Sequence, residues 1–385
     1  MLGAAVLACG CALVAAPSAS AIPWDAPGAI PPELTPAPTL PDPECLQSYA
    51  DDAPAGGPRL RFGVGPRLSG DVGTGQTAAA VPENKRERDR RLLQLQGKKH
   101  LSVRLNRLFM ADGAAGIRQF KRMAKHYDSL GIDVTLQVRY HPAPEQNGDI
   151  GAWLDYVRKV VRAFGPIEHV TALQITNEVN LKVSPNTSDG AYDGAVEALV
   201  RGVPAAKREA TKRGYDQLTV GFNYAWRFGG DADFWREVGA AGGARLRKAT
   251  DWVGIDAYPG FFVPPTFTDA GDSLLEAIAQ MRECFMPLAG FGSRVPIHVD
   301  ELGYPTGPGR SEDAQLDALN GFMRTLSRYR GTYGVTEAFW FGLRDNDSSS
   351  PTPQSQYGLL RSDYSPKPAF GGYRQIIRDL GSGTV

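Results

Sequence analysis

TALQITNE, residues 171–178, and VPIHVDELGY, residues 295–304, are two short apolar runs that each carry a glutamate at the end. Glu178 and Glu301 stand where a predicted β-strand gives way to a loop. An unpaired carboxylate at a partly buried strand end is costly. Two such acids, far apart in the sequence, therefore indicate one active site assembled from several strand ends. A (β/α)8 barrel builds its sites in this way.

Apolar, β-branched runs recur along the whole chain, and helical patterns lie between them. Strands are predicted at residues 60–64, 101–109, 134–140, 171–175, 218–224, 252–258, 295–299 and 337–341. Helices, with apolar residues at three- and four-residue spacing, are predicted at residues 87–95, 114–130, 150–164, 192–213, 232–244, 273–288, 314–329 and 369–380. Eight strand–helix units over about 320 residues match a (β/α)8 TIM barrel in size and order.

A doubly wound open sheet is the competing arrangement. Such a sheet usually carries a G-x-G-x-x-G phosphate loop after its first strand. Gly63, Gly65 and Gly70 follow the first predicted strand but do not supply this spacing. The barrel is therefore the preferred architecture.

The composition restricts the class of ligand. The chain has 385 residues, of which 42% are hydrophobic, with 42 Lys and Arg against 42 Asp and Glu. The formal net charge is zero, whereas a nucleic-acid or anionic-membrane partner would favour a basic excess. The 5 histidines form no Cys/His cluster with metal-ligand spacing, so no metal or cofactor is expected. An oligosaccharide or polysaccharide, most of which are neutral, suits this balance better.

The N-terminal residues 1–21 resemble a secretion signal. An apolar run covers residues 2–16, and Ala19-Ser20-Ala21 forms a small-x-small cleavage pattern. No Lys or Arg precedes the run, which leaves the true start of the signal open. Residues 22–57 are rich in Pro and Ala and are predicted to form an extended arm or linker. The catalytic barrel is predicted over residues 58–385, in a secreted or cell-wall-associated monomer with no membrane span once the signal is removed.

Two cysteines remain if cleavage follows residue 21. Cys45 lies in the arm and Cys284 in the barrel. An exported chain is compatible with a disulfide between them, which would tie the arm to the body. The alternative is a pair of unpaired, partly buried thiols.

The pair Asn177-Glu178 on the fourth strand and the run Glu301-Leu302-Gly303-Tyr304 on the seventh together resemble clan A of the glycoside hydrolases. The resemblance covers residues from about 59 to 380, and it implies a retaining (β/α)8 enzyme with Glu178 as general acid/base and Glu301 as nucleophile. The family within the clan is not resolved. The Asn-Glu-Val and Glu-x-Gly-Tyr-Pro patterns are similar to those of endo-β-1,3-glucanases. The C-terminal runs Leu343-Arg344-Asp345 and Lys367-Pro368-Ala369 are similar to those of xylosidase-like and cellulase-like members.

The resemblance also implies residues that support Glu301. Val103-Arg104 resembles the clan's Val-Arg, so Arg104 is expected to bind Glu301, with Arg107 on the same strand as the alternative. Tyr258 is expected to donate a hydrogen bond to Glu301, or else to pack at the barrel rim. Trp340 is expected to form the floor of a sugar subsite, or else to belong to the core.

Further residues are expected to contact the sugar. Asn177 is expected to donate to the 2-hydroxyl group, and Tyr304 to offer an aromatic face. His141 and Asn223 are expected to bind hydroxyl groups, although His141 is equally compatible with a hydrogen-bonded loop residue. His298 and Asp300 alternate with Glu301 along the strand, so both are expected to face the helices as structural residues.

The predicted function is a secreted retaining glycoside hydrolase that cleaves O-glycosidic bonds of a β-linked glycan by double displacement. Retention uses two carboxyl groups about 5–5.5 Å apart, one ionised and one protonated. A non-catalytic carbohydrate-binding or cell-wall-associated barrel is one alternative, and a transglycosylase that excludes water from the same site is another. The sugar, the linkage and the choice of endo or exo action remain open.

Overall fold

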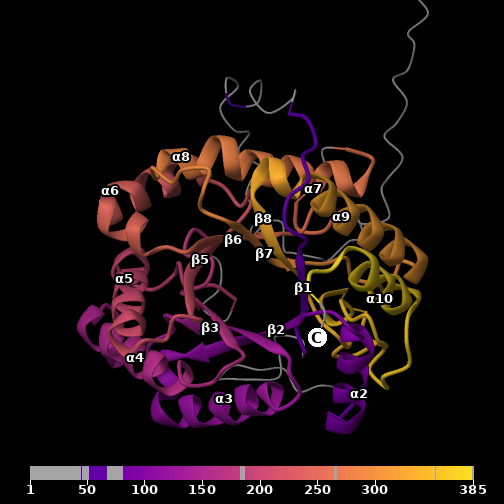
Figure 1. Cartoon of the computed structure of the whole chain (residues 1–385), viewed down its shortest axis with the longest axis horizontal. Helices are drawn as coiled ribbons and strands as arrows, with labels where there is room; N and C mark the ends of the chain where they lie inside the picture. The colour runs from indigo at the N-terminus through magenta and orange to yellow at the C-terminus, as the bar shows by residue number, and fades with distance from the viewer. Residues whose placement is uncertain are drawn as a thin grey trace, which may run out of the picture.

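The chain folds into a closed barrel of parallel strands, shown in Figure 1. The computed structural model describes residues 45, 52–66, 81–182, 187–263, 267–351 and 353–383. Each strand pairs with the next, and β8 pairs back with β1. The strands are β1 (Arg61–Val64), β2 (Leu101–Phe109), β3 (Asp133–Arg139), β4 (Val170–Ile175), β5 (Thr219–Ala225), β6 (Trp252–Ala257), β7 (Ile297–Leu302) and β8 (Val335–Trp340). The predicted (β/α)8 barrel is confirmed, and the open sheet is excluded.

Helices surround the barrel and alternate with its strands (Figure 1). They are α2 (Lys85–Gln96), α3 (Gly113–Asp128), α4 (Ile150–Phe164), α5 (Ala195–Arg213), α6 (Asp231–Ala249), α7 (Ala270–Ala279), α8 (Met286–Leu288), α9 (Glu312–Tyr333) and α10 (Pro368–Leu380). Short 3₁₀ turns, η3 (Met110–Asp112), η4 (Pro144–Gln146) and η6 (Pro353–Ser355), lie in the loops.

The helix predicted at residues 273–288 is in three pieces. A π-helical segment, η5 (Gln280–Phe285), separates α7 from α8. Pro287 follows this segment, and a proline has no N–H to donate to the preceding turn. The regular α-helical hydrogen-bond pattern therefore cannot continue through it.

Polar side chains fix where four of the helices begin. Asn84, Asp149, Asp269 and Ser311 each accept a hydrogen bond from the backbone N–H three residues later. The N–H groups of the first helical turn would otherwise lack partners. Each such cap contributes about 1 kcal/mol to stability, so the local sequence sets where α2, α4, α7 and α9 begin.

Polar side chains from several strands meet inside the barrel. Glu337 on β8 accepts hydrogen bonds from Ser102 on β2 at 2.5 Å and from Arg61 on β1 at 3.2 Å. His298 on β7 lies 3.6 Å from the same carboxylate and stacks on Trp252 of β6 with ring centroids 4.3 Å apart. His298 therefore faces the barrel interior, and the prediction that it faces the helices is wrong.

A β-bulge in β7 explains a second error of the same kind. The pairing of β7 with β6 passes from Val299 to Glu301, which leaves Asp300 as an extra residue. A Cβ atom on Gly254 of β6 would collide with the Asp300 carboxylate, so Asp300 also points inward. The bulge breaks the alternation of side chains and aims two consecutive acids at the same side of the sheet.

A disulfide joins Cys45 to Cys284 of η5, with the two Cα atoms 5.6 Å apart. The predicted disulfide is confirmed, and the alternative of two free thiols is excluded. Near it, the backbone of Ala55 lies on the end of α9, where its N–H donates to Thr332 Oγ1 at 2.8 Å and its carbonyl accepts from Gly331 N at 2.8 Å. The N-terminal segment is thus attached to the barrel by both covalent and hydrogen bonds.

The signal peptide predicted at residues 1–21 and most of the arm predicted at residues 22–57 lie outside the described residues. Both remain predictions. Among the helices that the structure describes, none is long and apolar enough to cross a membrane.

Removing the disulfide should destabilise the protein without changing its fold. The bond links residues separated by 239 positions, and a cross-link over so long a loop restricts the unfolded chain strongly. We expect Cys284→Ser to lower the free energy of unfolding by about 2–4 kcal/mol, measured by urea denaturation. Wild-type protein treated with a reducing agent is the matched control and should show the same loss. An unchanged denaturation midpoint in both samples would contradict a structural role.

Candidate active site

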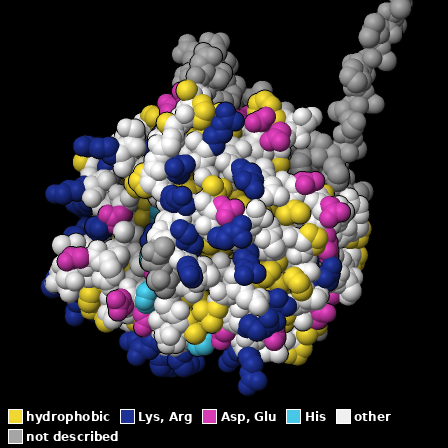
Figure 2. Space-filling view, turned by 45° about the vertical axis from the view of Figure 1, so that its right-hand side comes forward, with side chains coloured by type: hydrophobic (Ala, Val, Ile, Leu, Met, Phe, Trp, Pro, Cys, Tyr) yellow, Lys and Arg dark blue, Asp and Glu magenta, His cyan; other side chains and the backbone are white. Residues whose placement is uncertain are grey.

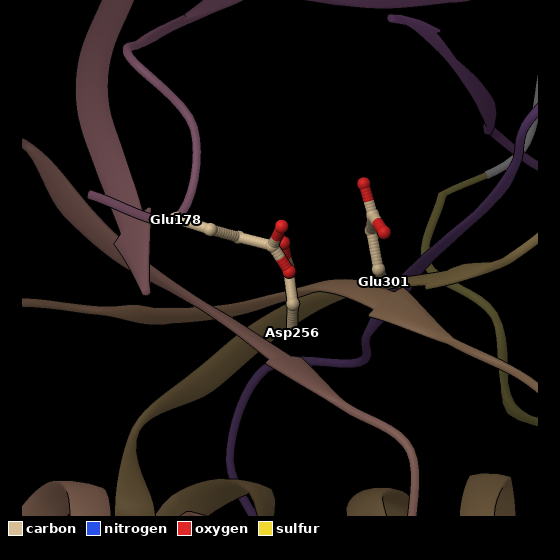
Figure 3. A group of neighbouring side chains, drawn as sticks. All are labelled: Glu178, Asp256 and Glu301. Carbon is tan, nitrogen blue, oxygen red and sulfur yellow. The ribbon is translucent and has the colours of Figure 1, made fainter. Parts of the chain in front are cut away.

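Glu178 and Glu301 lie together where the strands end at the mouth of the barrel. Glu178 follows β4, and Glu301 is part of β7. One carboxylate oxygen of each, and one of Asp256 on β6, lie within 4.8 Å of one another. In Figure 3 the carboxyl groups of Glu178 and Asp256 point toward each other, and Glu301 stands beside them. The structure thus brings together the two glutamates that the sequence singled out.

Two hydrogen bonds hold the Glu301 carboxylate. Arg104 Nη1 donates to Oε1 at 2.6 Å, and the Tyr258 hydroxyl donates to Oε2 at 2.8 Å. The Arg104 guanidinium is itself fixed by Gln174 Oε1, which accepts from Nη2 at 2.6 Å. An arginine and a hydroxyl group thus donate to the two oxygens of this partly buried carboxylate. Arg104 and Tyr258 therefore occupy the positions predicted for them.

Glu178 has the opposite environment. Burial, and secondly the charge of Glu301, raise the pKa of Glu178 to about 8, against the attraction of Arg139 and Arg104. Glu178 as a whole is only 8% exposed. At neutral pH, Glu178 is therefore mainly protonated. Two neighbouring carboxyl groups with different protonation states can act as an acid and a base.

Asn177 orients Glu178 through a buried amide network. Its Nδ2 donates to Glu178 Oε2 at 3.1 Å, and its Oδ1 accepts from Gln137, Asn223 and Gln174 at 2.7, 3.0 and 3.1 Å. These amides come from β3, β4 and β5. The side chain of Asn177 is thus fixed beside Glu178 by three strands of the barrel.

The backbone around Glu178 is strained. Thr176 has a φ of 67° and Glu178 a φ of 46°, a region that residues other than glycine rarely occupy. The buried Asp189 holds this turn, because its Oδ2 accepts from Asn177 N at 2.9 Å and its Oδ1 from Arg139 Nε at 2.8 Å. Strain of this kind costs about 1–3 kcal/mol per residue and clusters at functional sites.

Asp256 adds a third carboxyl group to the site. Burial, followed by the charges of Glu301 and Glu178, raises the pKa of Asp256 well above its ordinary value. Asn223 Nδ2 donates to Asp256 Oδ2. Three carboxyl groups so close together are also a donor set for a cation. The raised pKa values of Glu178 and Asp256 and the pairing of Glu301 with Arg104 reduce the negative charge available to hold such an ion.

An aromatic cluster lies beside Glu301. The Tyr258 ring packs edge-on against Phe262, Tyr357 and Phe341, with centroids 5.1, 5.6 and 5.8 Å apart. Phe262 and Phe341 are only partly buried. They offer apolar surface to a ligand that reaches Glu301, as aromatic rings do for sugar faces.

Trp340 does not offer such a surface. It is 0% exposed, and its Nε1 donates to the carbonyl of Tyr357 at 3.0 Å. Glu337 and Phe339 point into the barrel, where the Phe339 ring fills the space beside Gly63. Alternation along β8 then places Trp340 on the outer face. In this structure Trp340 is a packing residue and not the exposed sugar platform that the resemblance predicts.

The other predicted contact residues are also engaged with the protein. Tyr304 is 1% exposed and lies under the Arg310 guanidinium, 5.3 Å from its ring centroid. Asn223 is fully buried and accepts a hydrogen bond from the backbone N–H of Glu178 at 3.0 Å, so it helps to position Glu178. His141 is partly buried, and its Nδ1 forms a 2.7 Å hydrogen bond with the Tyr192 hydroxyl. Their roles toward a sugar remain predictions.

Several residues of the site were not predicted. A usable signal existed for Gln137 and Arg139 on β3 and for Gln174 on β4, because polar residues at every second position of an apolar strand indicate a polar barrel interior. The same signal existed for Asp256, because it lies two residues before Tyr258 and alternation places both side chains on the same side. Asp189 comes from a loop, and no sequence pattern indicates its position.

Comparison with known proteins relates part of the chain to fungal enzymes. No family model matches the chain. It is 23% identical over 142 residues to a probable glucan endo-1,3-beta-glucosidase of Aspergillus terreus and 25% identical over 144 residues to that of Aspergillus clavatus. The matched region is 37% of this chain, but only 28% and 30% of those two relatives. The chain therefore matches less than a third of their length.

Solved structures of glycoside hydrolases share the architecture. A family 39 glycoside hydrolase of Bacteroides cellulosilyticus superposes with a TM-score of 0.59 at 18% identity, over 84% of this chain and 64% of that one. A beta-glucosidase of Thermotoga maritima gives 0.56 at 14% identity, over 84% and 98%. A family 17 beta-1,3-glucanosyltransferase of Rhizomucor miehei gives 0.50 at 16% identity, over 74% and 89%. The chain has the (β/α)8 barrel fold of these glycoside hydrolases.

The raised pKa of Glu178 should appear as a pH dependence of stability. A pKa above the unfolded value of 4.5 means that the folded state loses stability as the pH rises toward and through about 8. Glu178→Gln removes this loss. We expect the free energy of unfolding of the variant, relative to the wild type, to increase by on the order of 2–4 kcal/mol between pH 5 and pH 9.

Denaturation by urea at each pH measures this difference. Glu87→Gln, on the surface of α2, is the matched control and should show no such increase. A constant difference between Glu178→Gln and the wild type across this pH range would show that Glu178 does not titrate as the site geometry requires.

Proposed function

We propose that the protein is a retaining glycoside hydrolase of clan A that cleaves a β-linked glycan. One observation carries the proposal: Glu301 accepts hydrogen bonds from Arg104 and Tyr258, while Glu178, with a pKa of about 8, lies within 4.8 Å of it. This spacing between carboxylate oxygens favours the retaining arrangement, in which the two groups are about 5–5.5 Å apart, over the wider inverting one. The fold shared with glycoside hydrolases is compatible with this chemistry.

In the first step, Glu301 attacks the anomeric carbon of the bound sugar. Glu178 gives its proton to the departing oxygen, so that the glycosidic C–O bond breaks and the leaving sugar departs as an alcohol. A covalent ester between the sugar and Glu301 results. Tyr258 and Arg104 keep the attacking carboxylate ionised and aimed until the new bond forms.

In the second step, Glu178 acts as a base. Ester formation removes the negative charge of Glu301, and that charge is one of the causes of the raised pKa of Glu178. The pKa of Glu178 therefore falls in the intermediate, which favours its role as a proton acceptor. Glu178 takes a proton from water, the hydroxide attacks the anomeric carbon, and Glu301 is released with the original anomeric configuration restored.

The finer assignments belong to the same proposal. The relatives named as probable glucan endo-1,3-beta-glucosidases support a polysaccharide substrate with β-linked units. The disulfide between Cys45 and Cys284 supports an exported protein, because disulfides persist mainly outside the cytosol. Asn177 is proposed to contact the 2-hydroxyl group and His141 another hydroxyl group once the sugar is bound.

Replacing either glutamate should remove turnover while the fold is retained. We expect Glu178→Gln to lower kcat about a hundred- to ten-thousandfold and Glu301→Gln to abolish covalent chemistry, because an amide is a poor nucleophile. Product release from β-glucans, mannan, xylan and galactan, followed by mass spectrometry, measures the loss and also separates hydrolysis from transglycosylation. Glu87→Gln is the control and should keep full activity.

Azide distinguishes the two roles in glycine variants assayed with an activated aryl β-glycoside. With Glu178→Gly, azide attacks the covalent intermediate and should give a β-glycosyl azide. With Glu301→Gly, azide replaces the nucleophile and should give an α-glycosyl azide. The reverse assignment of products would overturn the roles, and normal hydrolysis by either glutamine variant would overturn the proposed function.

The pH profile follows from the protonated state of Glu178. Because the acid form is needed in the first step, kcat/KM should fall above about pH 8, the pKa of Glu178 in the free enzyme. An aryl glycoside whose leaving group needs no proton should not show this alkaline fall. Initial rates from pH 5 to pH 10 on both kinds of substrate test the expectation, and identical alkaline limbs would argue against Glu178 as the acid.

A further inference from the structure

Arg107 is a cationic residue near the site, and the proposed mechanism assigns it no role. It lies near the end of β2 at a register shift between Leu105 and Leu108, where a bulge redirects the chain. Its φ is 68°, and its backbone N–H donates to Gln137 Oε1 at 2.9 Å. Gln137 also donates to Asn177 Oδ1, so the strained backbone of Arg107 is fixed by the network that orients Glu178.

The charges around Arg107 do not neutralise it. Arg104 is paired with Glu301 at 2.6 Å, and Arg139 with Asp189 at 2.8 Å. Within the part of the chain that the structure describes, no acceptor lies within hydrogen-bonding distance of the Arg107 guanidinium. The three arginines thus face two paired carboxylates, and one positive charge is left over.

The surroundings make this free charge costly. Burial, and secondly the neighbouring Arg139, lower the pKa of Arg107 to about 10, against the attraction of Glu301 and Glu178. Arg107 therefore stays charged at neutral pH, and it is only partly buried, so that it keeps some contact with solvent. A neutral hydroxyl group would leave the charge uncompensated, whereas an anion would neutralise it.

The charge of the rest of the protein does not explain the site. The formal net charge is zero. On the face turned forward in Figure 2, Lys and Arg side chains gather over the middle, and most Asp and Glu side chains lie toward the edges. A net charge of zero does not select an anionic ligand, so the selection depends on charges local to the site.

We propose that Arg107 binds the carboxylate of a uronic acid unit, so that the glycan cleaved between Glu178 and Glu301 is acidic. The planar guanidinium fork matches a carboxylate through two parallel hydrogen bonds, which gives both affinity and orientation. This inference rests on the proposed function for its location, because it names the substrate class of the same site. Binding of the sugar can nevertheless be measured apart from its cleavage.

The test compares two oligosaccharides of the same β-linked backbone, one neutral and one oxidised at C6 so that each glucose becomes a glucuronic acid. Titration calorimetry on Glu178→Gln, in which turnover is slow, measures binding alone. We expect the oxidised oligosaccharide to bind at least about tenfold more tightly than the neutral one. Arg107→Gln in the same background should remove this preference, and Arg107→Lys should restore it in part. Arg118→Gln, an exposed arginine on α3, is the matched control and should leave it unchanged.

Three outcomes would overturn the inference: equal binding of both oligosaccharides, a preference that survives in Arg107→Gln, or equally tight, Arg107-dependent binding of a C6-sulfated oligosaccharide. If Arg107→Gln does not fold, as judged by circular dichroism, the salt dependence of Glu178→Gln decides the question. Sodium chloride should weaken binding of the oxidised oligosaccharide and not of the neutral one. Failure of the proposed function would appear instead as absent turnover of every glycan by the wild type, whatever the binding results.

Discussion

The partly buried ion pair between Arg104 and Glu301 is the interaction on which the rest of the site depends. Isolated buried charges are strongly disfavoured, and a partner with good hydrogen-bond geometry is needed to keep them ionised. Arg104 gives Glu301 that partner at 2.6 Å, and Gln174 fixes Arg104 in turn. The ionised Glu301 then helps to raise the pKa of Glu178. One interaction thus produces the difference in protonation that separates a nucleophile from an acid.

The backbone of the barrel is locally strained and irregular around this site. Arg107, Thr176 and Glu178 have positive φ angles, and β7 contains a bulge at Asp300. The Gln137 amide binds the backbone of Arg107, and the Asn223 amide and the Asp189 carboxylate hold Asn177 between Thr176 and Glu178. Asp300 lies inside the barrel behind Glu301, and burial raises its pKa to about 7. Strained backbone and buried acids gather at the ends of the strands, while regular β-structure and apolar packing form the rest of the barrel.

The sequence predicts the architecture and the central pair of acids well, because strand–helix alternation and strand-end acids depend on local composition. It does not predict the bulge at Asp300, since one extra residue leaves the hydrophobic pattern unchanged but reverses the direction of the side chains. The role of Trp340 could not be predicted either, because a tryptophan suits a sugar platform and a core position equally. Asp189 reaches Asn177 through a loop whose path is set by tertiary contacts. A net charge of zero likewise says nothing about the unpaired Arg107.

The most direct test of the central claim is mass spectrometry of the enzyme after reaction with a 2-deoxy-2-fluoro-β-glycosyl fluoride of the sugar that it cleaves. The fluorine slows release of the covalent intermediate more than its formation, so the glycosyl-enzyme accumulates. The account predicts one added sugar per molecule, on the proteolytic peptide that carries Glu301. A label on Glu178 or Asp256, or turnover of natural substrate with inversion and no label at all, would contradict it.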